Sequence, residues 1–255
     1  MLSSLLDPLF SPLLVLPSWL AIFLVSAVIS FFSTLAYKYL TDQVRMKRLK
    51  KELKSYQEKL KVLSKDDPQK AMVVQKEMMG KNMELMKQSF KPTLYTLLPL
   101  LIIFGWLNAH LAYEPLHPGV PFNVSVQMEK GFSGVVSLQA APSSLQVSTS
   151  TPASQSVVGG VASWTLKGSA GDYRLTFSSG NVSFSKEVIL TDETGVYAPP
   201  LEKVSSRPFV SVRLGNEKIR PLAGLPLVGG FGWIGTYILM SMLLSILFRK
   251  LFGVV

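Results

Sequence analysis

The chain has 255 residues, of which 48% are hydrophobic and only 16% are charged, whereas charged residues make up about 25% of an average soluble domain. Cysteine is absent, which excludes disulfides, thiolate metal sites and thiol nucleophiles. The two histidines, His110 and His117, are too few for a histidine zinc site, which usually has at least three protein ligands. The composition therefore predicts a membrane protein without a metal or other cofactor.

The net charge of +10 is concentrated in one part of the chain. Residues 38–91 hold fifteen Lys or Arg and seven Asp or Glu, whereas residues 113–221 hold nine and eight. Short cytoplasmic loops of membrane proteins carry an excess of Lys and Arg. A solvated surface or a nucleic-acid-binding tail is an alternative interpretation, which the apolar segments on both sides of residues 38–91 disfavour. We expect the N-terminus outside, residues 38–91 in the cytoplasm, residues 113–221 outside, and the C-terminus in the cytoplasm.

Residues 1–17 are apolar but contain three prolines, and we expect a short extracytoplasmic lead-in. The first transmembrane helix is expected over 18–37, because an apolar helix of about 20 residues spans the bilayer. Within it, every third or fourth residue is polar, which places these side chains in one stripe along the helix. The stripe consists of Ser26, Ser30, Ser33 and Tyr37.

Residues 38–91 have the pattern of a helical hairpin. Apolar residues from Met46 to Leu63 recur in steps of three and four, which is the heptad pattern of a coiled coil. Asp66, Asp67 and Pro68 then supply a turn and a helix start. A second helix follows, with an apolar face of Met72, Met79, Met83, Met86 and Phe90. We therefore expect an antiparallel coiled-coil hairpin in the cytoplasm.

The second transmembrane helix is expected over 92–112, with a kink at Pro99 and the polar residues Thr96 and Asn108. Residues 113–223 then change to short runs of alternating polarity, separated by Gly, Pro, Ser and Asn. Seven strands are expected: Phe122–Met128, Val135–Leu138, Leu145–Ser148, Ser156–Leu166, Tyr173–Phe177, Val182–Leu190 and Phe209–Leu214. This number of strands in about 100 residues predicts a β-sandwich.

The segment from Gly171 to Phe177 resembles the G-D-Y strand of immunoglobulin-like extracellular modules in microbial proteins. The fold class is therefore expected to be a membrane α-helical protein with an inserted extracytoplasmic immunoglobulin-like β-sandwich. Asn123 and Asn181 match the N-glycosylation acceptor pattern. The third transmembrane helix is expected over 224–248, opening in a glycine-rich run, and residues 249–255 form a cytoplasmic tail.

No catalytic motif occurs, and no acidic residue lies within a predicted span, so we do not expect an enzyme. Polar stripes on the spans instead predict a partly hydrated groove that is open to the cytoplasm. The alternative is that these small residues only pack helices together. The groove residues are expected to be Ser26, Ser30, Ser33, Tyr37, Lys38, Thr96, Asn108, Tyr237, Ser241, Ser245 and Arg249.

Methionines cluster in the second hairpin helix, and flexible methionine suits surfaces that bind varied apolar segments. Met79 and Met86 are expected to fill the seam of the coiled coil. For Met72, Met78 and Met83 two interpretations stay open, namely contact with a client protein and packing in the seam.

The order of these segments resembles the YidC/Oxa-type membrane insertases, and most closely their archaeal YidC-like branch, which is related to subunit 3 of the ER membrane protein complex. The resemblance covers about residues 17–113 and rests on Pro17–Leu20, the heptad run from Met46 to Leu63, and Met78–Met83 before Pro92. No span carries the arginine that many of these relatives have in the groove, and Lys38 is the nearest substitute. The β-sandwich is an addition to the minimal core of that family.

The resemblance implies an insertase or chaperone that guides hydrophobic segments of nascent proteins into the bilayer through a shallow polar groove. Its expected partners are nascent membrane proteins, the ribosome, the lipid bilayer and further subunits, with no small-molecule substrate. The alternative function is a cell-surface receptor or adhesion protein whose external β-sandwich binds a partner. The expected location is the cell membrane.

Overall fold

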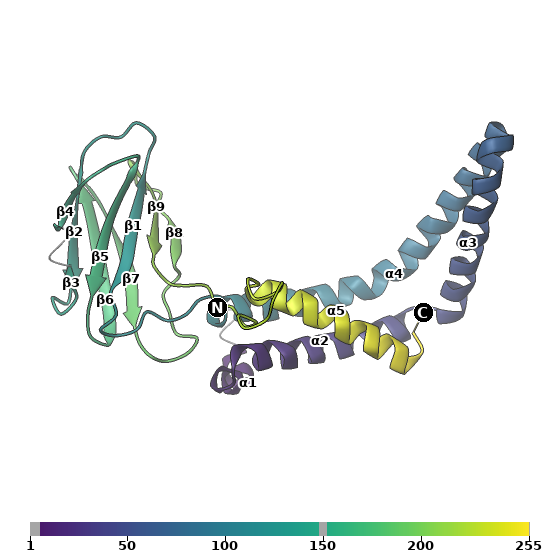
Figure 1. The fold of residues 1–255 in the computed structure, drawn as a ribbon, viewed down its shortest axis with the longest axis horizontal. Coiled ribbons are helices and arrows are strands. Elements are labelled where there is room, and N and C mark those ends of the chain that lie inside the picture. The colour runs from purple at the N-terminus through teal and green to yellow at the C-terminus, as the bar shows by residue number, and fades with distance from the viewer. Residues whose placement is uncertain (1–5, 148–151, 255) are drawn as a thin grey trace. The chain divides into compact units, whose positions relative to one another are not determined.

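The computed structural model describes residues 6–147 and 152–254, which form two compact units (Figure 1). The helical unit contains residues 19–105 and 234–254, and the β unit contains residues 6–18 and 106–233. The helices are α1 (Asp7–Phe10), α2 (Ser18–Leu40), α3 (Gln43–Asp66), α4 (Pro68–His110) and α5 (Trp233–Phe252), with a 3-10 helix η2 over Ser11–Val15.

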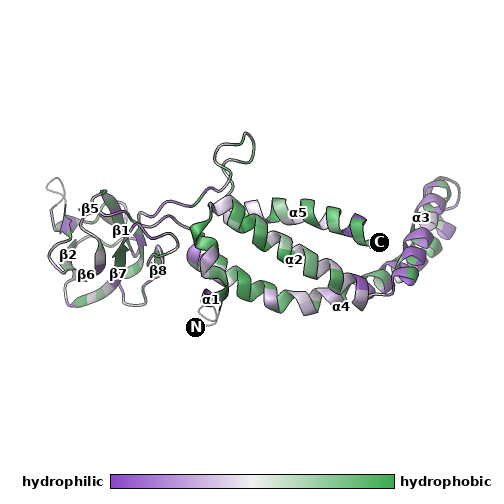
Figure 2. Cartoon of the chain, turned by 90° about the horizontal axis from the view of Figure 1, so that it is seen from below, coloured by the Kyte–Doolittle hydropathy of each residue, from purple (hydrophilic) through white to green (hydrophobic). Residues whose placement is uncertain are grey.

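Among the described residues, three helices are long and apolar enough to cross a membrane. These are α2, α4 and α5, as expected from the three apolar stretches of the sequence. Figure 2 shows α2 and α5 as mainly hydrophobic, whereas α3 and the adjoining part of α4 are mainly hydrophilic. The prediction of three membrane-spanning helices is confirmed as regards their length and apolar composition.

The helices α3 and α4 form the predicted hairpin. Asp67 is the one residue between them, and its Oδ1 accepts a hydrogen bond from the backbone N–H of Lys70 at 3.1 Å, which caps the start of α4. Two ion pairs connect the helices: Arg45 donates two hydrogen bonds to Glu84 Oε1, and Lys81 Nζ lies 2.9 Å from Glu52 Oε2. Along α3 the paired residues rise from 45 to 52, while their partners on α4 fall from 84 to 81. The two helices are therefore antiparallel.

The hairpin part of α4 carries two apolar stripes, and only one of them faces α3. The less exposed stripe recurs in steps of three and four: Ala71, Val74, Met78, Lys81 and Leu85. Met79 and Met86 are 65% and 57% exposed, so the expectation that they fill the seam is wrong. A pair of helices buries a single stripe on each partner, and here α4 buries the stripe that includes the small residue Ala71. The coiled-coil geometry of the hairpin stays a prediction.

The helix α4 continues without interruption through Pro92 and Pro99 to His110. The sequence predicted a boundary between hairpin and span at Pro92, and the structure has one helix across it. The third span differs from its prediction, since α5 begins at Trp233 and ends at Phe252, whereas residues 224–232 form turns. The turns require glycine at position 229, because a Cβ there would lie 2.7 Å from the carbonyl oxygen of Leu225.

In its described residues, the β unit has nine strands in two antiparallel sheets. One sheet has the order β3-β5-β1-β9-β8 and the other the order β4-β2-β6-β7. The strands are β1 (Phe122–Met128), β2 (Val135–Ala141), β3 (Gln146–Val147), β4 (Ser154–Ser156), β5 (Val161–Lys167), β6 (Gly171–Ser179), β7 (Val182–Leu190), β8 (Leu201–Lys203) and β9 (Phe209–Leu214). The two sheets share one hydrophobic core, in which Trp164 and Phe177 are almost fully buried.

The strands β1, β7 and β9 have the predicted bounds. The predicted strand Ser156–Leu166 is wrong as a single element, because Gly159 and Gly160 adopt φ angles of 61° and 79° and turn the chain between β4 and β5. The short strand β8 was not predicted, and the end of the predicted strand Leu145–Ser148 lies outside the described residues. The immunoglobulin-like classification stays a prediction.

Candidate functional site

A small polar cleft lies where the three candidate spans meet in the helical unit. Its volume is about 130 Å³, which leaves room for several water molecules. Residues from α2, α4 and α5 line it: Ser33, Thr34, Tyr37, Pro92, Thr93, Thr96, Ser245 and Arg249. We call this cavity the polar cleft.

The α2 wall of the polar cleft follows from the spacing of polar residues on this helix. Ser33 and Tyr37 are four residues apart, so both side chains lie on one face. The Tyr37 hydroxyl lies 3.3 Å from Ser89 Oγ on α4, and the Arg249 guanidinium carbon lies 5.0 Å from the centre of the Tyr37 ring. Tyr37 therefore contacts both other helices, and its ring stabilises the cation of Arg249 by a cation–π interaction.

The α4 wall consists of Pro92 and two threonines. Proline has no backbone N–H, so an interior proline leaves a helix carbonyl without its usual donor. Thr93 Oγ1 donates to the carbonyl of Ser89 at 3.0 Å, and Thr96 Oγ1 lies 3.2 Å from the carbonyl of Pro92. The carbonyl that Pro92 leaves without a backbone donor is that of Gln88, so both threonine hydroxyls bond to other carbonyls, each four residues earlier in the helix.

The structure brings five of the eleven predicted groove residues to the polar cleft. These are Ser33, Tyr37, Thr96, Ser245 and Arg249. Three further lining residues were not predicted: Thr34, Pro92 and Thr93. The spacing gave a signal for Thr34, which lies four residues after Ser30 on the same stripe. Spacing also gave a signal for Thr93, which lies three residues before the predicted Thr96 and so shares its face of α4.

The other predicted groove residues lie elsewhere. On α2, Ser26 and Ser30 are 0% and 5% exposed, and Ser30 Oγ donates to the carbonyl of Ser241 at 3.4 Å. The Ser241 hydroxyl donates to the carbonyl of Ile238 within α5. The Ser30 hydrogen bond joins α2 to α5, and none of the three serines lines the polar cleft.

Lys38, Tyr237 and Asn108 also have positions outside the polar cleft. Lys38 Nζ lies 5.9 Å from the centre of the Phe252 ring, and the Tyr237 ring meets Phe104 edge to face at 4.7 Å. Asn108 belongs to the β unit, where its carbonyl accepts a hydrogen bond from the hydroxyl of Tyr197 at 3.0 Å. Burial raises the pKa of Tyr197 to about 12, so this hydroxyl stays protonated as a donor.

Two hydroxyl groups in the helical unit are buried without a hydrogen-bond partner among the described residues. These are Ser26 Oγ on α2 and Thr236 Oγ1 on α5, and both residues are 0% exposed. A buried polar group without a partner costs about 1–3 kcal/mol. The helical unit therefore keeps polar groups in its interior at an energetic cost.

The methionines of the second hairpin helix are mostly exposed. Met72 and Met83 are 72% and 50% exposed, whereas Met78 is half-buried and lies three residues before Lys81, whose Nζ pairs with Glu52 of α3. Together with Met79 and Met86, the exposed members form a row on the outside of the hairpin, which we call the methionine row. Leu94, Leu97 and Leu101 are also 44–58% exposed and extend the apolar surface along α4.

The family comparison agrees with this arrangement of helices. The chain matches the model of a family described as "integral membrane protein EMC3/TMCO1-like" over residues 3–146, which is more than half of its length. The chain belongs to this family. The family is related to the Oxa1/YidC insertases. No curated protein and no solved structure matches the chain. The chain is thus an integral membrane protein of an insertase-related family, and no comparison supports the alternative of a receptor.

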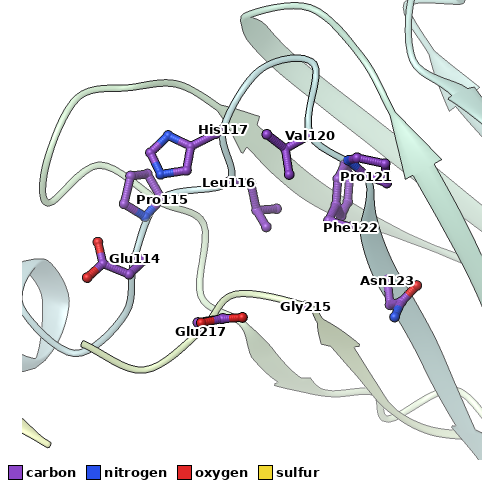
Figure 3. A pocket seen from close by; sticks show the side chains of 10 residues that line it. All are labelled: Glu114, Pro115, Leu116, His117, Val120, Pro121, Phe122, Asn123, Gly215 and Glu217. Atoms are coloured by element: carbon purple, nitrogen blue, oxygen red, sulfur yellow. The ribbon is translucent and has the colours of Figure 1, made fainter. Parts of the chain in front are cut away.

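This EMC3/TMCO1-like chain has a second, larger cavity in the β unit, of about 370 Å³ (Figure 3). Prolines and apolar side chains form much of its wall, beside the carboxylates of Glu114 and Glu217. His117 Nδ1, also in this wall, lies 2.8 Å from Asp192 Oδ1. Among the described residues, no group of three or more acidic or histidine side chains is placed to hold a metal ion. The cavity touches no candidate span, so the polar cleft is the site that fits a membrane function.

Proposed function

We propose that the chain is a membrane protein insertase that guides hydrophobic segments of nascent proteins into the bilayer, without a catalytic group or a cofactor. The observation that supports this proposal best is the polar cleft, which all three candidate spans build together. Membership in an insertase-related family gives it independent support.

The polar cleft suits the polar tail that accompanies a hydrophobic segment into the membrane. Polar groups are costly in hydrocarbon unless they find partners or water. The cleft supplies hydroxyl groups from Ser33, Thr96 and Ser245, and its volume admits several waters. Arg249 adds a positive charge that attracts an acidic tail, and Lys38 adds a second charge on α2. A tail that crosses beside these groups keeps part of its hydration and meets a lower barrier.

The methionine row suits the hydrophobic segment itself. Its side chains are exposed, flexible and apolar, which favours binding of varied sequences. Because α4 is one continuous helix, apolar side chains are exposed from Met72 on the hairpin to Leu101 in the span. A client segment that binds the methionine row can move toward the bilayer along this surface without losing apolar contact.

The remaining features of the proposal concern topology and partners. The basic excess of residues 38–91 favours a cytoplasmic coiled-coil hairpin whose surface meets ribosomal RNA or anionic lipid. The β unit is then an extracytoplasmic, immunoglobulin-like domain, with the N-terminus outside and the C-terminus inside. In this topology the chain resembles archaeal YidC-like proteins, and further subunits are expected partners.

The test is insertion of small one-span and two-span proteins into liposomes that contain the full chain. Filling the polar cleft with the triple variant Ser33→Leu, Thr96→Leu and Ser245→Leu is expected to lower the insertion rate roughly tenfold, since losing one polar contact in the barrier state costs about 1.4 kcal/mol. Gly105→Leu is the control, because it also introduces a leucine side chain into α4, at an exposed position with nothing within 4 Å. A triple variant that folds and inserts at the parent rate would refute the role of the cleft.

A further inference from the structure

The chain between β9 and α5 presents apolar side chains to the outside of the β unit. Leu225, Leu227 and Phe231 are 53%, 100% and 40% exposed. Leu227 also has a φ of 69°, a backbone conformation that residues other than glycine rarely adopt. We call residues 217–232 the apolar loop. A fully exposed leucine held in a disfavoured backbone conformation points to a surface that a partner covers.

The apolar loop is built as a series of hydrogen-bonded turns. The backbone N–H of Leu225 donates to the carbonyl of Leu222, that of Gly229 to Leu225, and that of Phe231 to Val228, at 2.9–3.0 Å. The backbone itself thus holds Leu227 at the tip, and Gly229 is required where a Cβ would meet the carbonyl of Leu225. The exposure of the Leu227 side chain therefore follows from the backbone fold of this loop.

A cavity of about 380 Å³ with a net positive wall adjoins these apolar side chains in sequence. Its wall contains Glu217, Lys218 and Arg220 at one end of the apolar loop and Gly230 and Gly232 at the other. Hydrogen bonds from Glu114 N–H to the Glu217 carbonyl and from Ile219 N–H to the Ala112 carbonyl fix the backbone under the two cations. Both cations are exposed, and neither forms an ion pair within the described residues. Two unpaired cations against the single carboxylate of Glu217 leave this wall with a net positive charge, which suits a phosphate group.

The position of the apolar loop in the chain identifies its partner as lipid. The membrane helix α5 begins at Trp233, two residues after Phe231, so Phe231 lies within about 7 Å of the helix start along the chain. Apolar side chains this close to the start of a membrane helix reach the boundary of the hydrocarbon, and neighbouring cations attract anionic headgroups. A free phosphate would use the cations but would leave Leu225 and Leu227 uncovered.

We propose that the apolar loop is a lipid-binding site. Leu225, Leu227 and Phe231 insert into the leaflet on the side of the β unit, and Lys218 and Arg220 bind the phosphate of an anionic lipid headgroup. The site fixes the β unit to the membrane surface at the entry to α5. This proposal goes beyond insertion and does not depend on it.

The insertion of Leu227 is tested with a single fluorescent label. The chain has no cysteine, so Leu227→Cys introduces a unique thiol for an environment-sensitive dye. The full chain is placed in lipid nanodiscs, with Val158→Cys as the control, because Val158 is 78% exposed in the turn between β4 and β5. We expect blue-shifted emission at Leu227→Cys and quenching by lipids brominated near the glycerol. Emission equal to the control, or a blue shift that brominated lipid does not quench, would overturn the proposal, the latter because protein then covers the loop.

The headgroup preference is tested on the same labelled chain. A spin label on the headgroup of phosphatidylglycerol is expected to quench the dye several-fold more than one on phosphatidylcholine. The double variant Lys218→Ser and Arg220→Ser should remove this preference, whereas the exposed pair Lys130→Ser and Lys167→Ser should keep it. Inorganic phosphate in excess over lipid should also leave the preference in place. Equal quenching by both lipids in the parent, or loss of the preference to inorganic phosphate, would overturn the assignment to a lipid headgroup.

Discussion

The β unit and the helical unit treat buried polar side chains differently. In the core of the β unit, Lys186 is 2% exposed and places Nζ 2.6 Å from Glu202 Oε2, and Trp164 Nε1 donates to the carbonyl of Ala153. In the helical unit, the hydroxyls of Ser26 and Thr236 are buried without a partner among the described residues. Outside its core, the β unit has one comparable atom in the described chain, Oδ1 of Asn216.

This difference teaches what each unit is built to do. A domain whose polar groups serve folding alone pairs them, because each unpaired buried group costs about 1–3 kcal/mol. A helix bundle that receives polar parts of a client gains by keeping hydroxyls available. The hydroxyls that line the polar cleft are thus consistent with the proposed insertase function, whereas those of Ser26 and Thr236 are fully buried and lie outside it. Four sets of substitutions test how far the contrast extends.

The largest change in the free energy of unfolding is expected for a buried apolar side chain of the helical unit. The changes at polar residues are compared with it below. Met46 is 0% exposed in the hairpin seam, so Met46→Ala should lower the free energy of unfolding by about 2–5 kcal/mol. Met83→Ala, at a 50% exposed position, should change it by no more than about 0.5 kcal/mol. Denaturant unfolding of the full chain in detergent, followed by hydrogen exchange of α3, measures both. Equal losses would show that the methionine row is part of the packed hairpin.

A smaller loss is expected from the paired charge of the β unit. Glu202→Gln leaves the Lys186 ammonium buried without a counter-charge, and it should destabilise the two sheets by about 1–3 kcal/mol, less than for a fully buried pair because Glu202 is 52% exposed. Glu187→Gln on the same strand as Lys186 is the control, since Glu187 is 77% exposed and should contribute little. Hydrogen exchange of β7 reports both values. Indistinguishable variants would mean that the β unit does not depend on this pairing.

Removal of the unpaired hydroxyls of the helical unit should not lower its stability, in contrast to removal of the paired charge in the β unit. Ser26→Ala and Thr236→Val remove buried groups that have no partner in the described structure, so stability should stay constant or rise by up to about 1 kcal/mol. Unfolding in mixed detergent and lipid measures the change, with Ser30→Ala as the comparison because Ser30 donates to the carbonyl of Ser241. A loss above about 1 kcal/mol at Ser26 or Thr236 would show that these hydroxyls have stabilising partners in the membrane.

The smallest effect concerns the exposed ion pair of the hairpin. The hydrogen bond from Lys81 holds the pKa of Glu52 below its ordinary value of 4.5, so the carboxylate stabilises the hairpin above that pH. This contribution should disappear as the pH falls from about 5 through the lowered pKa of the folded state. Hydrogen exchange of α3 in the parent, in Glu52→Gln and in the control Glu58→Gln, compared at each pH, measures it. A difference between parent and Glu52→Gln that persists in acid would exclude the charge as its cause.

The sequence predicted much of the architecture, because the strongest signals were local. Apolar length identified the three spans, Asp67 and Pro68 identified the hairpin turn, and alternation identified β1, β7 and β9 with their bounds. These features depend on neighbouring residues in the chain. The start of α5 and the division at Gly159 and Gly160 also depend on local backbone conformations, which composition alone did not predict.

The candidate site was predicted less completely because it depends on which helix faces which. The stripes on α2 and α5 were visible, but the structure places Ser30 against the α5 backbone and Ser33 at the polar cleft, although they are only three residues apart. In the same way, α4 carries two apolar stripes, and only the position of α3 decides that Met78 is covered while Met79 is exposed. Periodicity gives the faces of a helix, and packing decides how each face is used.

The most direct test of the proposed function is site-specific photocrosslinking from the helical unit to a client. A photoreactive residue is placed at Ser33 in the polar cleft or at Val28, which lies on α2 and is 53% exposed. Full chain in native membranes is then exposed to ribosome-bound nascent chains with one hydrophobic segment and a short polar tail. We expect crosslinks from the tail to Ser33 and much weaker ones to Val28. Efficient insertion without crosslinks at Ser33, or with equal crosslinks at both positions, would contradict passage through the polar cleft.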